Sequence, residues 1–242
     1  MRTDGRKADQ LRPLVFKRHY TRVAPGSTLV RLGRTTVLCT CSVDEGVPPF
    51  LVGTGKGWLT AEYSMLPGST RPRKQRDRAG KVDGRSVEIQ RLIGRSLRSV
   101  VHLDKLGERT LAIDCDVLEA DGGTRTAAIN GAYVALVDAV AASAALLPAG
   151  ESVVHDSVAA ISVGILDGTA ILDLFYEEDR DADVDMNLVM TGSGKLVEVQ
   201  GTGEEATFTR KQLDDMLDLG RRGIEAVTAK QKRALGKKWP LD

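Results

Sequence analysis

The pattern of apolar and polar positions in the first part of the chain predicts strands followed by a helix. Residues 28–43 (TLVRLGRTTVLCTCSV) are rich in β-branched side chains and are interrupted at Gly33-Arg34, which is typical of a β-hairpin. Residues 58–63 (WLTAEY) predict a further strand. Between residues 87 and 101, apolar side chains recur with a period of about 3.6, which predicts an amphipathic helix.

The rest of the chain repeats this order of strands before helices. Asp167-Gly168 joins two apolar runs and is a strong signal for a hairpin turn. Strands followed by helices in each half favour an α+β fold of two similar lobes, and Pro148-Ala149-Gly150 separates residues 1–150 from residues 151–242. The further expected elements are a strand at 110–118, an alanine-rich helix at about 124–147, strands at 158–166, 169–175, 186–190 and 196–200, and a helix at about 210–235.

Composition narrows the class of protein. Hydrophobic residues make up 42% of the 242 residues, enough for a sizeable core, and 34 basic against 33 acidic residues give a net charge of +1. Any attraction to nucleic acid therefore has to come from local clusters. Three cysteines in apolar runs, Cys39, Cys41 and Cys115, are typical of buried thiols in a reducing compartment. No uncharged run approaches the ~20 residues that span a bilayer, so we expect a cytoplasmic protein without a membrane partner.

Two short segments at predicted helix starts are candidates for binding an anion. In Asp121-Gly122-Gly123-Thr124-Arg125, free N–H groups, a hydroxyl and a guanidinium would converge on a phosphate. The alternative is a tight glycine turn with Thr124 as a cap. Arg85 stands at the start of the earlier helix, where its charge opposes the helix dipole unless an anion lies nearby; the alternative is a solvated arginine.

An acidic segment at residues 177–185 (EEDRDADVD) is a candidate for binding a cation. Asp179, Asp181, Asp183 and Asp185 would face one side of a strand, an arrangement of like charges that repels itself. The segment is therefore either a solvated loop or a site for a hard cation, which prefers oxygen ligands.

A basic segment precedes the first predicted helix. Residues 67–84 (PGSTRPRKQRDRAGKVDG) carry six basic side chains against Asp77 and Asp83, a local charge of +4. Such a segment suits contact with a phosphate backbone independently of base sequence. The alternative is a mobile, solvated loop. The basic side chains are Arg71, Arg73, Lys74, Arg76, Arg78 and Lys81.

Together these segments resemble the ribonuclease PH family over about residues 1–235. The matching stretches are residues 2–12 (RTDGRKADQLR), 55–67 (GKGWLTAEYSMLP), 88–98 (EIQRLIGRSLR), 114–126 (DCDVLEADGGTRT) and 184–206 (VDMNLVMTGSGKLVEVQGTGEEA). The resemblance implies a fold of two βαβα-like lobes of mixed sheet packed with helices. It also implies a phosphorolytic 3′→5′ exoribonuclease, a nucleotidyltransferase that trims tRNA precursors and uses inorganic phosphate as co-substrate.

The resemblance also assigns roles to individual residues. Arg85 would bind the attacking phosphate, and Asp179 and Asp185 would bind Mg²⁺, with Mn²⁺ as an alternative ion. The remaining implied residues are Gly123, Thr124 and Arg125 in the phosphate site, with Arg85 and Arg125 catalytic beside the two aspartates, and Arg71, Arg73 and Arg76 in contact with tRNA.

The family further implies a homo-hexamer built as a trimer of dimers, with RNA as partner (tRNA precursors, and rRNA as a second class) and not DNA. Two rivals remain. The chain could be a catalytic subunit of a larger phosphorolytic ring of the exosome or polynucleotide phosphorylase kind, or a non-catalytic, RNA-binding ring subunit. Scaffold subunits tend to lack the phosphate and metal residues, and all of these residues are present in this chain.

Overall fold

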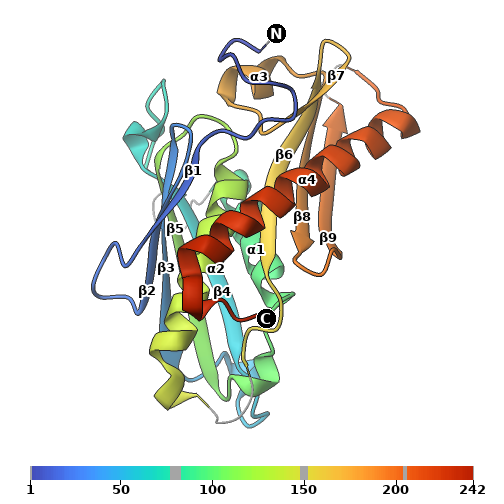
Figure 1. Ribbon diagram of the computed structural model, residues 1–242. Coiled ribbons are helices and arrows are strands. Elements are labelled where there is room, and N and C mark those ends of the chain that lie inside the picture. Colours follow the sequence, from blue (N-terminus) through green and yellow to red (C-terminus); the bar gives the residue numbers. More distant parts are fainter. Residues whose placement is uncertain (1, 77–82, 148–151, 204–205, 242) are drawn as a thin grey trace.

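The computed structural model describes residues 2–76, 83–147, 152–203 and 206–241 and contains two β-sheets with helices between and beside them (Figure 1). The first sheet has the order β1-β2-β3-β5-β4 and is antiparallel except where β4 runs parallel to β5. Its strands are β1 (Leu14–Arg18), β2 (Gly26–Leu32), β3 (Thr35–Glu45), β4 (Trp58–Met65) and β5 (Arg109–Glu119).

The second sheet is antiparallel throughout and has the order β7-β6-β8-β9. Helix α4 (Arg210–Leu235) runs across this sheet and reaches β1 of the first sheet (Figure 1). Its start is capped by Thr209, whose hydroxyl accepts a hydrogen bond from the Gln212 N–H. The strands are β6 (Val158–Leu166), β7 (Thr169–Leu172), β8 (Val184–Thr191) and β9 (Leu196–Gly203).

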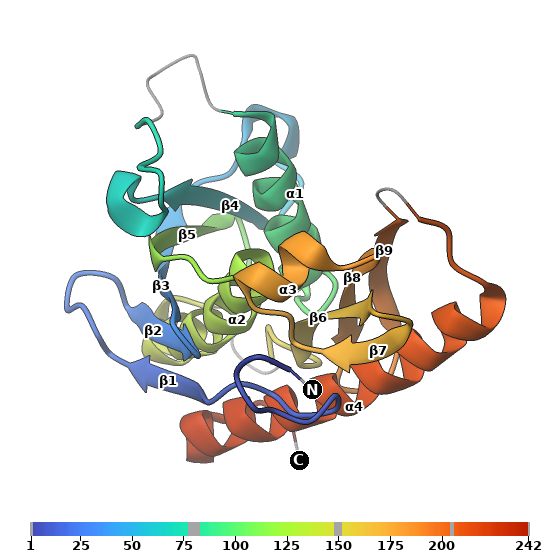
Figure 2. The same cartoon turned by 90° about the horizontal axis from the view of Figure 1, so that it is seen from above.

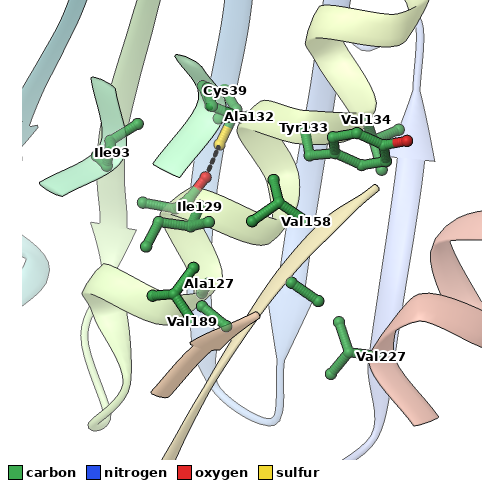
Figure 3. Packing of buried hydrophobic residues seen from close by; sticks show 14 of the residues in the cluster. Cys39, Ile93, Ala127, Ile129, Ala132, Tyr133, Val134, Val158, Val189 and Val227 are labelled. Carbon is green, nitrogen blue, oxygen red and sulfur yellow. Dashed lines mark hydrogen bonds between the residues drawn. The ribbon is translucent and has the colours of Figure 1, made fainter. Parts of the chain in front are cut away.

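Helix α2 (Thr124–Ala142) lies between the two sheets and is buried on every side. Its many alanines and Gly131 allow the strands to approach closely; a Cβ at Gly131 would lie 2.7 Å from Cys39 Sγ. Figure 3 shows Ile129 of α2 among apolar side chains from both lobes, including Val158 of β6. The two sheets therefore share one core, and the N-terminus of α2 is fixed at their common edge.

Two further helices complete the architecture. Helix α1 (Gly84–Arg98) packs against α2 and β4, and the Asp83 carboxylate caps it by accepting a hydrogen bond from the Ser86 N–H. The short helix α3 (Tyr176–Asp181) lies at the end of the molecule where α2 begins, the end that faces the viewer in Figure 2. Short 3₁₀ turns occur at Pro49–Leu51, Pro67–Ser69, Leu103–Lys105, Ala144–Leu146 and Gly236–Lys238.

Most elements expected from the sequence are confirmed, including both hairpins and the helix at 210–235. Three expectations differ from the structure. The alanine-rich helix ends at Ala142 instead of about 147, the second strand of the 167–168 hairpin ends at Leu172, and β1 was not anticipated. Arg78 and Lys81 of the basic segment, and the boundary proposed at residues 150–151, lie outside the described residues.

The acidic segment at 177–185 is neither a loop nor one face of a strand. Its first part forms α3, because the buried Glu178 carboxylate accepts a hydrogen bond from the Phe175 N–H and turns the chain into a helix. Its last two residues begin β8. None of the described helices combines the length and the apolar surface that crossing a bilayer requires.

Candidate active site

A cavity of about 240 Å³ lies where the N-terminus of α2 meets the second sheet. The predicted phosphate residues and the predicted metal residues come together here, although they are up to 100 positions apart (Arg85 to Asp185). Its lining is almost entirely polar: Arg85, Gly123, Thr124, Arg125, Ser162, Asp179, Ala182, Asp185, Asn187, Gln200 and Thr202.

The N-terminus of α2 presents unpaired backbone donors to this cavity. Gly123, the residue before the helix, has a positive φ of 66° and no side chain that could cap the first turn. The first N–H groups of a helix have no acceptor within the helix, and the helix dipole adds positive potential there. The 19-residue helix therefore presents an anion site at Thr124 and Arg125.

Tyr63 on β4 fixes the hydroxyl of Thr124. The Tyr63 hydroxyl donates a hydrogen bond of 2.9 Å to Thr124 Oγ1, so the Thr124 proton remains available to a ligand in the cavity. Burial raises the pKa of Tyr63, which keeps it protonated as a donor. The sequence analysis missed this residue; a tyrosine hydroxyl within a predicted buried strand was the available signal.

Arg125 is held by one residue from each lobe. Its Nη1 donates to Gln200 Oε1 of β9 at 2.8 Å and to Glu88 Oε1 of α1 at 3.4 Å. Gln200 also donates to Glu88 through Nε2 at 3.1 Å. Gln200 and Glu88 thus orient the guanidinium, while its other N–H groups stay free to bind two oxygens of a phosphate.

Arg85 lies in the first turn of α1 and is exposed. Within the described part of the chain it makes no hydrogen bond or ion pair, in contrast to Arg125. A cation at a helix N-terminus is unfavourable unless an anion compensates it. Arg85 lines the polar cavity, so an anion bound in that cavity would lie beside its guanidinium group.

Asp179 and Asp185 approach the same cavity from α3 and from β8. The Asp179 side chain is exposed, but the surrounding protein excludes part of the water from its carboxylate, and this desolvation raises the pKa of Asp179. The negative charge of Asp185 raises that pKa further. Arg85 and Arg125 act in the opposite direction. A shared cation would relieve the repulsion between these two carboxylates.

The donor set fits a magnesium ion better than a metal that needs a cage of protein ligands. No group of three or more His, Cys, Asp or Glu side chains arranged for a metal occurs among the described residues. Magnesium is usually held by one or two carboxylates, with water and substrate phosphate completing its octahedron. The pair Asp179 and Asp185 meets that requirement.

Arg12 is a residue that the sequence analysis did not assign. It is 5% exposed, and it donates to the carbonyl of Asp121 at 2.5 Å and to both carboxylate oxygens of Asp173 at 2.7 and 3.0 Å. Asp173 is fully buried. Arg12 thus joins the loop before α2 in the first lobe to the chain before α3 in the second, and holds the predicted phosphate residues close to the predicted metal residues.

Two more buried arginines from the N-terminal segment hold α3 in place. Arg2 pairs with both oxygens of Glu178 and donates to the Leu172 carbonyl at 2.8 Å, and Arg6 pairs with Asp173 at 3.3 Å. The signal in the sequence was a charged residue, Asp173, inside the apolar run ILDLF. A buried carboxylate in such a run needs partners, but local pattern could not indicate which arginines they are.

One of the basic side chains of the basic segment lines a second, larger cavity of about 1080 Å³. Arg71 lines this cavity, which shares Arg85, Gly123, Thr124 and Asp179 with the polar cavity and is therefore continuous with it. Arg73 and Arg76 are exposed and line neither cavity.

The chain is similar to curated proteins over nearly its whole length. Similar curated proteins include Ribonuclease PH of Rhodopirellula baltica, 57% identical over 96% of both chains. Ribonuclease PH of Moorella thermoacetica is 56% identical over 98% of this chain and 95% of its own.

Solved structures with the same fold are more distant in sequence. Rice (Oryza sativa) Rrp46 superposes with a TM-score of 0.78 at 22% identity, over 97% of this chain and all of that one. The Archaeoglobus fulgidus exosome with RNA bound to the active site gives 0.80 at 23% identity, over 95% and 92%. Models of domain 1 and domain 2 of the 3′ exoribonuclease family match residues 10–149 and 156–223. With both domain models matched along most of its length, the chain belongs to the 3′ exoribonuclease family.

Proposed function

We infer that this protein is a phosphorolytic 3′→5′ exoribonuclease that trims the 3′ ends of tRNA precursors, with rRNA as a second substrate class. The observation that carries this inference is the single cavity in which Arg85, Thr124 and Arg125 face Asp179 and Asp185. An anion site beside a carboxylate pair is what the transfer of a phosphoryl group from RNA to phosphate requires. Relatives at 56–57% identity over nearly the whole chain carry the name Ribonuclease PH.

The attacking phosphate is held by the first turn of α2 together with two guanidinium groups. The N–H groups and hydroxyl of Thr124, the fork of Arg125 and the charge of Arg85 bind its oxygens and leave one oxygen in line with the terminal phosphodiester. Such binding also lowers the repulsion between the phosphate and the anionic RNA. The Tyr63 hydroxyl and the Gln200 side chain hold these donors in place before the substrate arrives.

We propose that Asp179 and Asp185 hold Mg²⁺, with Mn²⁺ as the alternative ion. When bound, the ion supplies charge neutralisation at the scissile phosphodiester. α3 and β8 bring the two carboxylates into the same cavity as Thr124 and Arg125, so they would hold the ion beside the phosphate site.

The reaction exchanges one phosphorus–oxygen bond for another. An oxygen of inorganic phosphate forms a bond to the terminal phosphorus, and the bond to the 3′-oxygen of the preceding nucleotide breaks. That oxygen takes up a proton, so the products are a nucleoside diphosphate and an RNA shorter by one nucleotide. Because the bonds are similar in energy, the same site also adds nucleotides from diphosphates.

The test is incubation with a 3′-extended tRNA and Mg²⁺, with and without inorganic phosphate. Release of nucleoside diphosphates that depends on phosphate is the expected result. Release of monophosphates without phosphate would mean hydrolysis and contradict the mechanism, and an absence of product would favour a non-catalytic ring subunit.

Replacing Arg71, Arg73 and Arg76 together by alanine should weaken trimming of a tRNA precursor more than phosphorolysis of a short oligonucleotide. Interactions with the RNA backbone add affinity for a long polyanion without changing the chemistry. The slope of log affinity against log salt should fall by about one for each phosphate group that the variant no longer neutralises. The measurement is kcat/KM on both substrates at several salt concentrations.

The matched control removes three exposed basic residues of α4, Arg221, Arg222 and Lys230, which line neither cavity. This variant should retain the activity of the wild type on both substrates. Equal losses on the long and the short substrate in the Arg71/Arg73/Arg76 variant would contradict the role proposed for the basic segment.

We further propose that the protein is a homo-hexamer, a trimer of dimers, in the cytoplasm. Light scattering of the purified chain should then give six times its mass of 26.1 kDa. A stable monomer that assembles only with a second kind of chain would favour the exosome-like alternative. The three cysteines are buried free thiols, which fits a reducing compartment.

A further inference from the structure

The two connected cavities differ in the kind of surface they offer. The smaller one has a polar lining and no aromatic residue. The larger one contains Phe175 and Tyr176 as well as Met65. The two cavities share lining residues, so an RNA whose 3′ end occupies the smaller one can extend into the larger one, which has aromatic and cationic walls. Single-stranded RNA is bound by such a combination.

Tyr176 is held rigidly at its backbone but not at its ring. Its backbone nitrogen packs against Gly122, where an added Cβ would lie 2.8 Å away, and Gly122 itself has a positive φ of 72°. The residue is 54% exposed, so its ring is accessible to a ligand in the larger cavity. Among the described residues, no aromatic ring packs against it and its hydroxyl makes no hydrogen bond.

The position of Tyr176 relative to Asp179 sets its distance from the proposed site of bond cleavage. Tyr176 begins α3, and Asp179 follows one turn later. Three residues of helix cover about 4.5 Å, which is close to the rise of roughly 3.4 Å between stacked bases. If Asp179 lies at the terminal phosphodiester, Tyr176 lies about one nucleotide further along the RNA.

We propose that Tyr176 is a stacking platform for the base of the second nucleotide from the 3′ end. This inference rests on the proposed exoribonuclease activity and adds a subsite to it. The ring binds the face of the base, so it accepts all four bases, as processive or stepwise trimming of varied 3′ ends requires. Arg71, on the wall of the same cavity, is placed to contact the adjoining phosphate.

The first test measures binding without turnover. Fluorescence anisotropy of a labelled short RNA, in the absence of phosphate, should show about a tenfold weaker Kd for Tyr176→Ala, the effect expected for removing one base–aromatic stack. Tyr176→Phe and Tyr176→Trp should bind as the wild type does. The KM for inorganic phosphate should not change, because the phosphate site does not include Tyr176.

The second test locates the base. An RNA that lacks the base of the second nucleotide should bind the wild type about tenfold more weakly than the intact RNA, whereas Tyr176→Ala should bind both RNAs equally. Removing the base of the fifth nucleotide should affect both proteins to the same extent. A loss at the second nucleotide that is equal in the wild type and in Tyr176→Ala would overturn the proposal.

A matched control separates this subsite from a general effect of losing an exposed tyrosine. Tyr20 is also exposed, at 44%, and lines neither cavity, so Tyr20→Ala should bind RNA as the wild type does. Equal loss of binding in Tyr20→Ala and Tyr176→Ala would also overturn the proposal. Because binding is measured without phosphate, failure of the stacking subsite and failure of phosphorolysis give different results.

Discussion

Replacing Asp185 by asparagine should lower the rate of phosphorolysis by about a thousandfold, because a metal at a phosphoryl-transfer site contributes several kcal/mol to transition-state stabilisation. Asparagine keeps the size of the side chain but removes the charge that the cation needs. RNA binding should persist, since the arginines of the site and of the basic segment are untouched. Single-turnover phosphorolysis and anisotropy of a labelled RNA measure the two effects separately.

The matched control for this variant is Asp183→Asn. Asp183 belongs to the same acidic segment and is exposed, but it does not line the cavity. This substitution should leave the rate unchanged. If Asp185→Asn kept the wild-type rate, as Asp183→Asn is expected to do, the carboxylate pair would have no part in the reaction. The scaffold alternative would then regain support.

Replacing Arg125 by alanine should lower kcat/KM for inorganic phosphate by about 100- to 1000-fold, the usual effect of removing one preorganised donor from a transition-state site. The Arg125 side chain is only 15% exposed and is already oriented by Gln200 and Glu88. It therefore loses little conformational entropy when the wild type binds phosphate. Arg125→Lys should recover only part of the loss, because an ammonium group cannot form the two-pronged contact.

Initial rates at varied phosphate and fixed RNA provide the measurement. Arg91→Ala serves as the control, since Arg91 is an exposed arginine of α1 that lines neither cavity. An Arg125→Ala variant with an unchanged KM for phosphate and an unchanged kcat would exclude the assigned role of Arg125 in phosphate binding.

The elements with strong local patterns could be predicted from the sequence. Asp167-Gly168 and Gly33-Arg34 each produced the expected hairpin, because a turn and the strands beside it depend on neighbouring residues. The same holds for the glycine loop before α2, where turn, helix start and anion donors are adjacent in sequence.

Interactions between distant residues could not be predicted. The alternating aspartates at 179–185 suggested a strand or a loop. The helix α3 depends on Glu178, whose carboxylate is held in place by Arg2 from 176 positions away. Asp179 and Asp185 line the cavity because of their places on α3 and at the start of β8. Asp181 and Asp183, at the end of α3 and just before β8, do not line it. Tyr63 was missed for the same reason, because its partner Thr124 lies on another element.

The contacts of Arg2, Arg6 and Arg12 with Asp173 and Glu178 also set the order in which the site forms during synthesis. A nascent chain leaves the ribosome from its N-terminus, so these arginines emerge first and the glycine loop follows. Asp173 emerges 161 residues after Arg12, and Glu178 comes shortly after it. Until then Arg12 has no buried carboxylate to hold it against the loop, and no carboxylate pair faces the phosphate site. A chain that ends before the second lobe therefore lacks the carboxylate pair, and we expect phosphorolysis only after the second lobe has folded against the first.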